Sequence, residues 1–194
     1  LASRYGVEVA TDEVEVPYRR TISASAEAEG RVKKQSGGHG QFGDVKIDIR
    51  PLGRGEGFQF ENKIVGGTVP RQFIPAVEKG IRDRMARGGL AGYQCTDIKV
   101  RVFDGKYHDV DSDSRSFEMA GSKGFLAAFK LSSPVLLEPY MKIEVTCPEE
   151  VMGAVIGDLN NRRGHIAGMD AKGRMQVIKA TVPMAETLNY SAFL

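Results

Sequence analysis

The sequence lacks several features that define large protein classes. No window of its 194 residues approaches ~18 consecutive apolar residues, so we expect no segment that spans a membrane. It contains no tryptophan, and its two cysteines, Cys95 and Cys147, lie far apart and form no metal-spaced pair. Isolated thiols of this kind fit a reducing cytosol, where they serve as small core residues. The sequence therefore predicts a cytoplasmic protein without a disulfide framework.

The motifs of common enzymes are also missing. No stretch reads G-x-x-x-x-G-K-[ST], so phosphates would lack both an amide cradle and a lysine. G-x-S-x-G is absent, and neither thiol has a histidine near it in sequence. We therefore predict no catalytic residue and interpret the chain as a binding module.

Residues 35–44 form the most informative segment, because four of these ten residues are glycine. A basic stretch precedes the segment, and Val45, Ile47 and Ile49 alternate with polar residues after it. This pattern predicts a loop with few side chains on a half-buried strand. Such a loop suits insertion into a narrow site, with His39 and Gln41 left to make contacts. From the loop alone, a flexible hairpin is the simpler interpretation.

Hydrophobic periodicity predicts a first unit that mixes strands and helices. We expect strands over 18–34, 45–50, 58–61 and 98–102, and helices over 70–87 and 122–130. Asp104-Gly105 is predicted to form a turn, after which the chain returns through 107–119. The loops at 36–43 and 104–113 each carry a histidine. If they are neighbours in the sheet, they form one tip that can contact RNA backbone and bases, with basic residues around it meeting phosphates.

A second unit is predicted after Pro139. A strand over 141–145 precedes a helix that starts at Pro148, with Arg162 and Arg163 at its negative end and Gly164 as a left-handed stop. Strands over 166–169 and 175–182 follow, and Pro183 begins another helix. The order strand–helix–strand–strand–helix predicts a ferredoxin-like (βαββα) arrangement without its last strand. The fold class of the whole chain is α+β.

A metal site remains an alternative at this point. The carboxylates at 109–113 do not fit the calcium loop of helix–loop–helix proteins, because Ser114 and Ala120 stand where glycine and glutamate are required. His39, His108 and Asp111 would form a transition-metal site, and with it a metal-dependent hydrolase, only if the two loops meet in space. We expect no bound metal.

Many segments, in the same order, resemble the bacterial elongation factor G family of translational GTPases, which move tRNA and mRNA through the ribosome. They are 35–44, 60–67 with Pro70, 73–77 with 79–81, 97–100, 104–112, 137–139, 155–160, 162–164 and 168–169. The resemblance implies that 1–17 end domain III and form a linker. It further implies that 18–137 are domain IV, with a ribosomal protein S5 domain 2-like fold, and that 138–194 are a ferredoxin-like domain V truncated at its C-terminus. The chain is then expected to be a fragment of a longer protein.

The same resemblance implies a partner and a site. Domain IV of the family enters the decoding A site of the small subunit during GTP-dependent translocation, so the expected partners are ribosomal RNA of both subunits and the tRNA–mRNA in the A site. GTP and Mg²⁺ would belong to the absent N-terminal domain of a ribosome-stimulated GTPase. This chain would then be a monomer without cofactor, enzymatic activity or membrane contact. The residues implied to contact the ribosome or tRNA are Gly37, Gly38, His39, Gly40, Gln41, His108 and Asp109, with Arg162 and Arg163 as further ribosomal RNA contacts.

The predicted tip departs from the family pattern at one position. His39 stands where many members carry arginine, and imidazole, with a reference pKa of ~6.5, is mostly neutral at pH 7. The tip would thereby lose a permanent charge. A paralogue that acts in ribosome recycling, or in another step that is not translocation, is therefore the alternative function.

Overall fold

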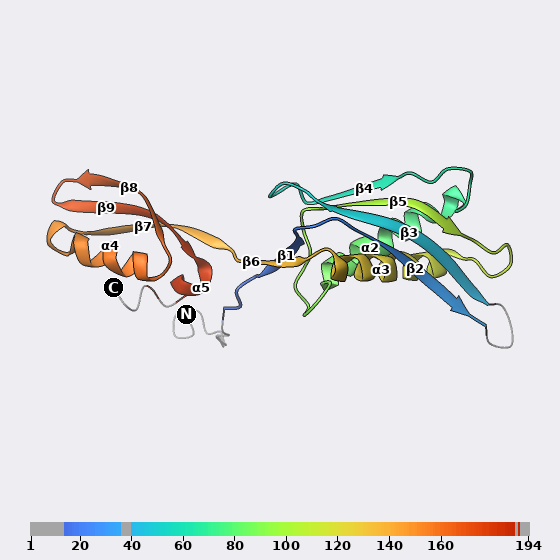
Figure 1. Cartoon of the computed structure of the whole chain (residues 1–194). Coiled ribbons are helices and arrows are strands. Elements are labelled where there is room, and N and C mark those ends of the chain that lie inside the picture. The colour runs from blue at the N-terminus through green and yellow to red at the C-terminus, as the bar shows by residue number, and fades with distance from the viewer. Residues whose placement is uncertain (1–13, 36–39, 189, 191–194) are drawn as a thin grey trace, which may run out of the picture. The chain divides into compact units, whose positions relative to one another are not determined.

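The computed structural model describes residues 14–35, 40–188 and 190 (Figure 1). The chain divides into two compact units. The first unit is Tyr18–Leu137, and the second is Glu138–Leu194 together with Leu1–Pro17. No helix within the described ranges is both long enough and apolar enough to cross a bilayer.

The first unit is a sheet covered by two helices on one face. Its elements are β1 (Arg19–Ile22), β2 (Ala26–Lys34), β3 (Gln41–Pro51), β4 (Phe58–Asn62), η1 (Arg71–Phe73), α2 (Ile74–Arg87), β5 (Ile98–Lys106), α3 (Ser114–Leu131) and β6 (Pro134–Leu137). The four-stranded sheet has the order β2-β3-β5-β4, and β1 pairs separately with β6. Only β4 and β5 are parallel within the larger sheet, because α2 crosses over between them. Helices α2 and α3 lie side by side along the sheet (Figure 1).

The alternation predicted for the strand after the glycine segment is confirmed. Val45, Ile47 and Ile49 are fully buried beneath the helices. Phe117 of α3 stacks on Phe73 with the ring centroids 4.7 Å apart, which anchors the helical layer to the same core. The intervening residues of β3 carry charged side chains on the opposite face, so the sheet has one apolar and one polar surface.

Three predictions for the first unit are wrong. Asp104 and Gly105 form no turn, because both pair with β3 and a register shift accommodates the extra residue Phe103 within β5. The chain does not return as a strand, since α3 begins at Ser114 instead of 122. The side chain of Asp113 caps this helix by accepting a hydrogen bond of 2.6 Å from the amide of Ser116. The strand predicted over 18–34 is divided into β1 and β2, because β1 pairs with β6.

The second unit confirms the predicted order strand–helix–strand–strand–helix. Its elements are β7 (Tyr140–Pro148), η2 (Glu149–Val151), α4 (Met152–Asn161), β8 (His165–Lys172), β9 (Met175–Pro183) and α5 (Met184–Thr187). The strands form an antiparallel sheet in the order β7-β9-β8. Leu159 of α4 packs against Ile178 and Val182 of β9, and all three are fully buried.

The stop after α4 differs from the prediction. Arg163, not Gly164, adopts the left-handed conformation, with φ of 59°. The amide of Gly164 donates to the carbonyl of Leu159 at 2.8 Å, and a Cβ on Gly164 would lie 2.6 Å from that oxygen. Gly164 is therefore required for a close backbone approach, while Arg163 takes the unusual backbone angle.

Helices α2 and α3 touch through backbone atoms. A Cβ at Gly80 would overlap the carbonyl oxygen of Glu118, and one at Gly121 would lie 2.6 Å from the carbonyl oxygen of Val77. Neither neighbour is a flexible side-chain end that could move aside. The spacing of the two helices therefore depends on two glycines.

Gly80→Ala is expected to lower the free energy of unfolding of the first unit by about 1–3 kcal/mol, because the added methyl group forces the helices apart. The matched control is Gly157→Ala in α4, where a Cβ would meet nothing within 4 Å. That change should leave stability unchanged or raise it by about 0.5–1 kcal/mol through helix propensity. Urea unfolding of each variant measures both effects, and equal stabilities would contradict the helix contact.

Candidate functional site

Two loops meet at one end of the first unit. Strand β2 pairs with β3 as far as Lys34 and Gln41, and β3 pairs with β5 as far as Asp44 and Lys106. The start of β3 and the loop after β5 therefore lie at the same end of the sheet (Figure 1). For the described residues, from Gly40 onward, this confirms that the two loops singled out in the sequence are neighbours. Gly37, Gly38 and His39 lie outside the described residues.

Asp111 joins the two loops. Its carboxylate Oδ1 accepts a hydrogen bond of 2.9 Å from the amide of Gly40, and its carbonyl accepts one of 2.8 Å from the amide of Phe42. The hydroxyl of Ser112 donates to the carbonyl of Phe42 at 2.9 Å. A Cβ at Gly40 would lie 2.8 Å from Asp111 Cγ, so a larger residue there would displace the carboxylate from this position. We call Gly40, Gln41 and residues 108–112 the tip.

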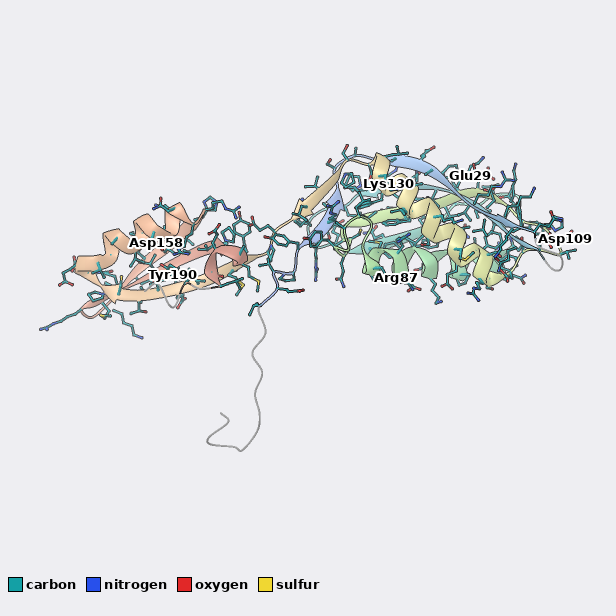
Figure 2. The ribbon with its side chains drawn as sticks, turned by 90° about the horizontal axis from the view of Figure 1, so that it is seen from below. Glu29, Arg87, Asp109, Lys130, Asp158 and Tyr190 are labelled. Carbon is teal, nitrogen blue, oxygen red and sulfur yellow. The ribbon has the colours of Figure 1, made fainter. Side chains whose placement is uncertain are left out.

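His108 and Asp109 lie on the outside of the tip. The His108 side chain is 57% exposed, and its Nδ1 lies 3.5 Å from Asp111 Oδ2. The amides of Val110 and Asp111 also point to Nδ1, each at 3.4 Å. The Nδ1 edge of the ring thus faces its own loop, which leaves the Nε2 edge as the outward donor or acceptor. Asp109 stands at one end of the first unit (Figure 2).

Sequence reasoning missed the structural role of Asp111 and Asp113. Asp111 was considered only as a metal ligand, yet it braces the loop that carries Gly40. Asp113, by contrast, was detectable, since aspartate followed by a long amphipathic run is a common helix start. Within the described residues, no three His, Cys, Asp or Glu side chains are grouped so that they could hold a metal ion. His39, the third ligand of the metal hypothesis, is not among them.

A buried carboxylate lies on the polar face of the sheet near the tip. Asp44 is 2% exposed, and its Oδ2 lies 3.8 Å from Arg31 Nε. Burial raises the pKa of the Asp44 carboxyl to about 6, and the hydrogen bond and negative charge of Glu29 on β2 act in the same direction. Arg31 and Lys106 oppose these effects only in part. Glu29 is labelled on β2 in Figure 2.

Arg162 and Arg163 are engaged within the second unit. Arg162 donates to Asp158 at 2.8 Å and to the carbonyl of Glu186 at 3.1 Å. Arg163 binds both oxygens of Glu138, at 3.0 and 2.7 Å, and this ion pair raises the pKa of its guanidinium. Both arginines therefore have a structural role at the C-terminus of α4. Contact with ribosomal RNA stays a prediction for each of them.

Comparison with known proteins places the chain. The family described as "Elongation factor G, domain IV" matches residues 14–133, and the one described as "Elongation factor G C-terminus" matches residues 135–194. An elongation factor G from Aquifex pyrophilus is 51% identical over the whole chain, which spans 28% of that protein. A crystal structure from Thermus thermophilus superposes with a TM-score of 0.85 at 42% identity, over 97% of this chain and 28% of that one.

These matches define a part of a translation elongation factor. The chain belongs to the elongation factor G family, and the resemblance seen in its sequence is confirmed. The predicted α+β fold class, a ribosomal protein S5 domain 2-like fold followed by a ferredoxin-like one, is confirmed as well. The chain spans 28% of the length of the Aquifex relative.

Asp111→Ala is expected to raise the hydrogen-exchange rate of the Gly40 amide about tenfold or more, because a hydrogen bond to a carboxylate contributes about 1.5–3 kcal/mol. Asp109→Ala is the matched control, since it removes an equal charge from the exposed part of the same loop. An unchanged Gly40 rate in Asp111→Ala would contradict the bracing contact.

Asp44→Asn is expected to raise the free energy of unfolding at pH 7.5 by about 1–3 kcal/mol. The folded-state pKa is raised, so ionising Asp44 costs the folded state free energy above about pH 6, and this cost vanishes below the reference pKa of 3.8. The gain should accordingly disappear by about pH 4, as measured by urea unfolding at both values.

The control for this experiment is Asp48→Asn on the same strand. Asp48 is similarly buried but forms an ion pair with Arg101, and it lies 3.2 Å from Arg50 Nε. Loss of the Asp48 charge should therefore lower the free energy of unfolding at pH 7.5. Destabilisation by both variants there would show that Asp44, too, is stabilised by its neighbours.

Proposed function

We propose that the tip enters the decoding A site of the small ribosomal subunit and promotes translocation of tRNA and mRNA. The observation that carries this proposal is the bracing of Gly40 by Asp111, which holds two loops as one narrow projection with His108 outward. Membership of the elongation factor G family supports the ribosome as the partner. Gly37, Gly38 and His39 would extend the same contact surface.

The chemistry of the tip suits contact with a codon–anticodon duplex. RNA helices expose a wide, shallow minor groove with 2′-hydroxyls, which hydrogen-bond donors and acceptors on a narrow element can reach. Glycine adds little bulk there, while His108 and Gln41 offer hydrogen-bonding groups. Arg31, Lys33 and Lys34 on the adjoining strand would meet phosphates, which fix the position of the protein without reading sequence.

The second unit would rest on RNA of the large subunit through Arg162 and Arg163. Such contact requires Arg163 to exchange its pair with Glu138 for a phosphate. The Arg163 side chain is 56% exposed, and exposed ion pairs contribute little to stability, so the exchange is energetically accessible. We further propose that the full-length factor is a cytoplasmic monomer and a ribosome-stimulated GTPase. GTP and Mg²⁺ would then bind outside this chain, which itself acts without cofactor, catalysis or membrane contact.

His108→Ala in the full-length factor is expected to slow translocation about tenfold, because losing one hydrogen bond to RNA costs about 1–2 kcal/mol in the rate-limiting step. GTP hydrolysis should change less than about twofold, since the nucleotide site lies outside this chain. A single-round toeprint on pretranslocation ribosomes measures the advance of one codon, and phosphate release measures hydrolysis.

His165→Ala is the control, because His165 is also exposed but starts strand β8 of the second unit. Equal loss of translocation and GTP hydrolysis in His108→Ala would contradict the placement of the tip. Ribosome-stimulated GTP hydrolysis by the unmodified factor without any advance would instead assign it to recycling, the alternative that His39 suggests. His39→Arg would then be the variant to test.

A further inference from the structure

A charged groove lies between α2 and α3, away from the tip. Its volume is about 280 Å³, and its walls include Arg84 and Arg87 of α2 and Ser122 and Lys123 of α3. Gly80 and Glu118, where the two helices meet at backbone distance, also line the groove. Arg87 is labelled on α2 in Figure 2, where α2 lies beside α3. We call this feature the α2–α3 groove.

The carboxylates of the groove already have a cation. Glu118 lies 2.7 Å from Lys79 Nζ, and Asp83 lies 4.0 Å from the same nitrogen. The hydrogen bond with Glu118 raises the pKa of Lys79, which keeps that partner charged. In the described part of the chain, Arg84, Arg87 and Lys123 have no carboxylate within 4.0 Å. The groove therefore has cations in excess.

Arg84 gives the strongest indication that the groove binds a ligand. Its side chain is half-buried, and its Nε is shielded from solvent without a hydrogen-bond partner among the described residues. A guanidinium nitrogen held in this way retains a free-energy cost until an acceptor reaches it. Arg87 lies one turn further along the same face of α2, so one anion, or two adjacent anions, could be bound by both. The Ser122 hydroxyl supplies a further donor from the opposite wall.

We propose that the α2–α3 groove binds a phosphodiester segment of RNA. Met119 is the single apolar side chain that lines it, whereas a docked peptide would need apolar or aromatic anchor pockets. Guanidinium, ammonium and hydroxyl donors are the groups that hold a phosphate backbone. The choice of RNA rests on the proposed function, while the anion site rests on the groove alone.

The helix dipole does not account for the whole arrangement. Arg84 and Arg87 stand in the last turn of α2, where a positive charge stabilises the helix end. Lys123 lies in the middle of α3, where no such benefit exists, and its ammonium group donates a hydrogen bond of 3.5 Å to the carbonyl of Arg31 on β2, which leaves its charge without a carboxylate. Cations from two helices thus line one groove.

The test is binding of the 194-residue chain to a fluorescein-labelled oligouridine RNA of about 12 nucleotides, measured by anisotropy over a series of salt concentrations. Arg84→Gln, Arg87→Gln and Lys123→Gln together should weaken binding about tenfold and lower the slope of log K against log salt by about 2. The matched control removes three exposed cations of the second unit, by Lys142→Gln, Lys172→Gln and Arg174→Gln. Because Arg84 is half-buried, its replacement could affect folding. The double variant Arg87→Glu and Lys123→Glu changes only exposed residues and tests the same groove with Arg84 intact.

The expected result is loss of affinity in both groove variants, with the control retaining its affinity. Bound RNA should also protect Lys123, but not Lys172, from acetylation. Equal losses in groove and control variants, or displacement of the RNA by an octaglutamate peptide at equal concentration, would overturn the proposal. Repeating the groove substitutions in His108→Ala separates the two sites, because a groove effect that persists there does not depend on the tip. If the full-length factor does not promote translocation while the 194-residue chain still binds oligouridine through the groove, the proposed function is contradicted and the groove proposal is not.

Discussion

Helix α3 packs at backbone distance against three different elements, β2, β3 and α2, and this constraint positions most of the first unit. A Cβ at Gly30 of β2 would overlap the carbonyl oxygen of Ala120, just as one at Gly80 of α2 would overlap that of Glu118. With no side chain between the partners, α3 has little freedom to shift sideways. Its capped N-terminus at Asp113 is therefore fixed relative to β3. The loop that ends there then brings Asp111 to Gly40.

Much of this architecture was readable from alternation and helical periodicity, because those patterns reflect which face of an element is buried. Val45, Ile47 and Ile49 identified β3, and the apolar stripe of α2 was equally plain. Asp104-Gly105 misled because the pair is typical of hairpin turns, whereas here a register shift keeps both residues in the ladder. The backbone contacts at Gly30 and Gly80 were not predictable, since they depend on an element distant in sequence.

The candidate site was readable to a smaller extent. Local glycine content and the two histidines indicated where the loops are, and strand order then placed them together. The hydrogen bond between Gly40 and Asp111 joins residues 71 positions apart, so no local pattern could reveal it. Likewise, the ion pair of Arg163 with Glu138 depends on the return of the chain through α4 after β7. Charge in the sequence says little about which cations remain available, because pairing is decided by tertiary structure.

The length of α3 has a mechanical consequence. Its 18 residues correspond to about 27 Å along the axis, from the loop that carries His108 to the short connection before β6. An α-helix bonded to itself along its whole length resists compression, and here it is also supported by a sheet and a second helix. A force applied at His108 would thus be transmitted along the rigid axis of α3 to Ser132 and Ser133. These residues lie a few positions before the first unit ends at Leu137.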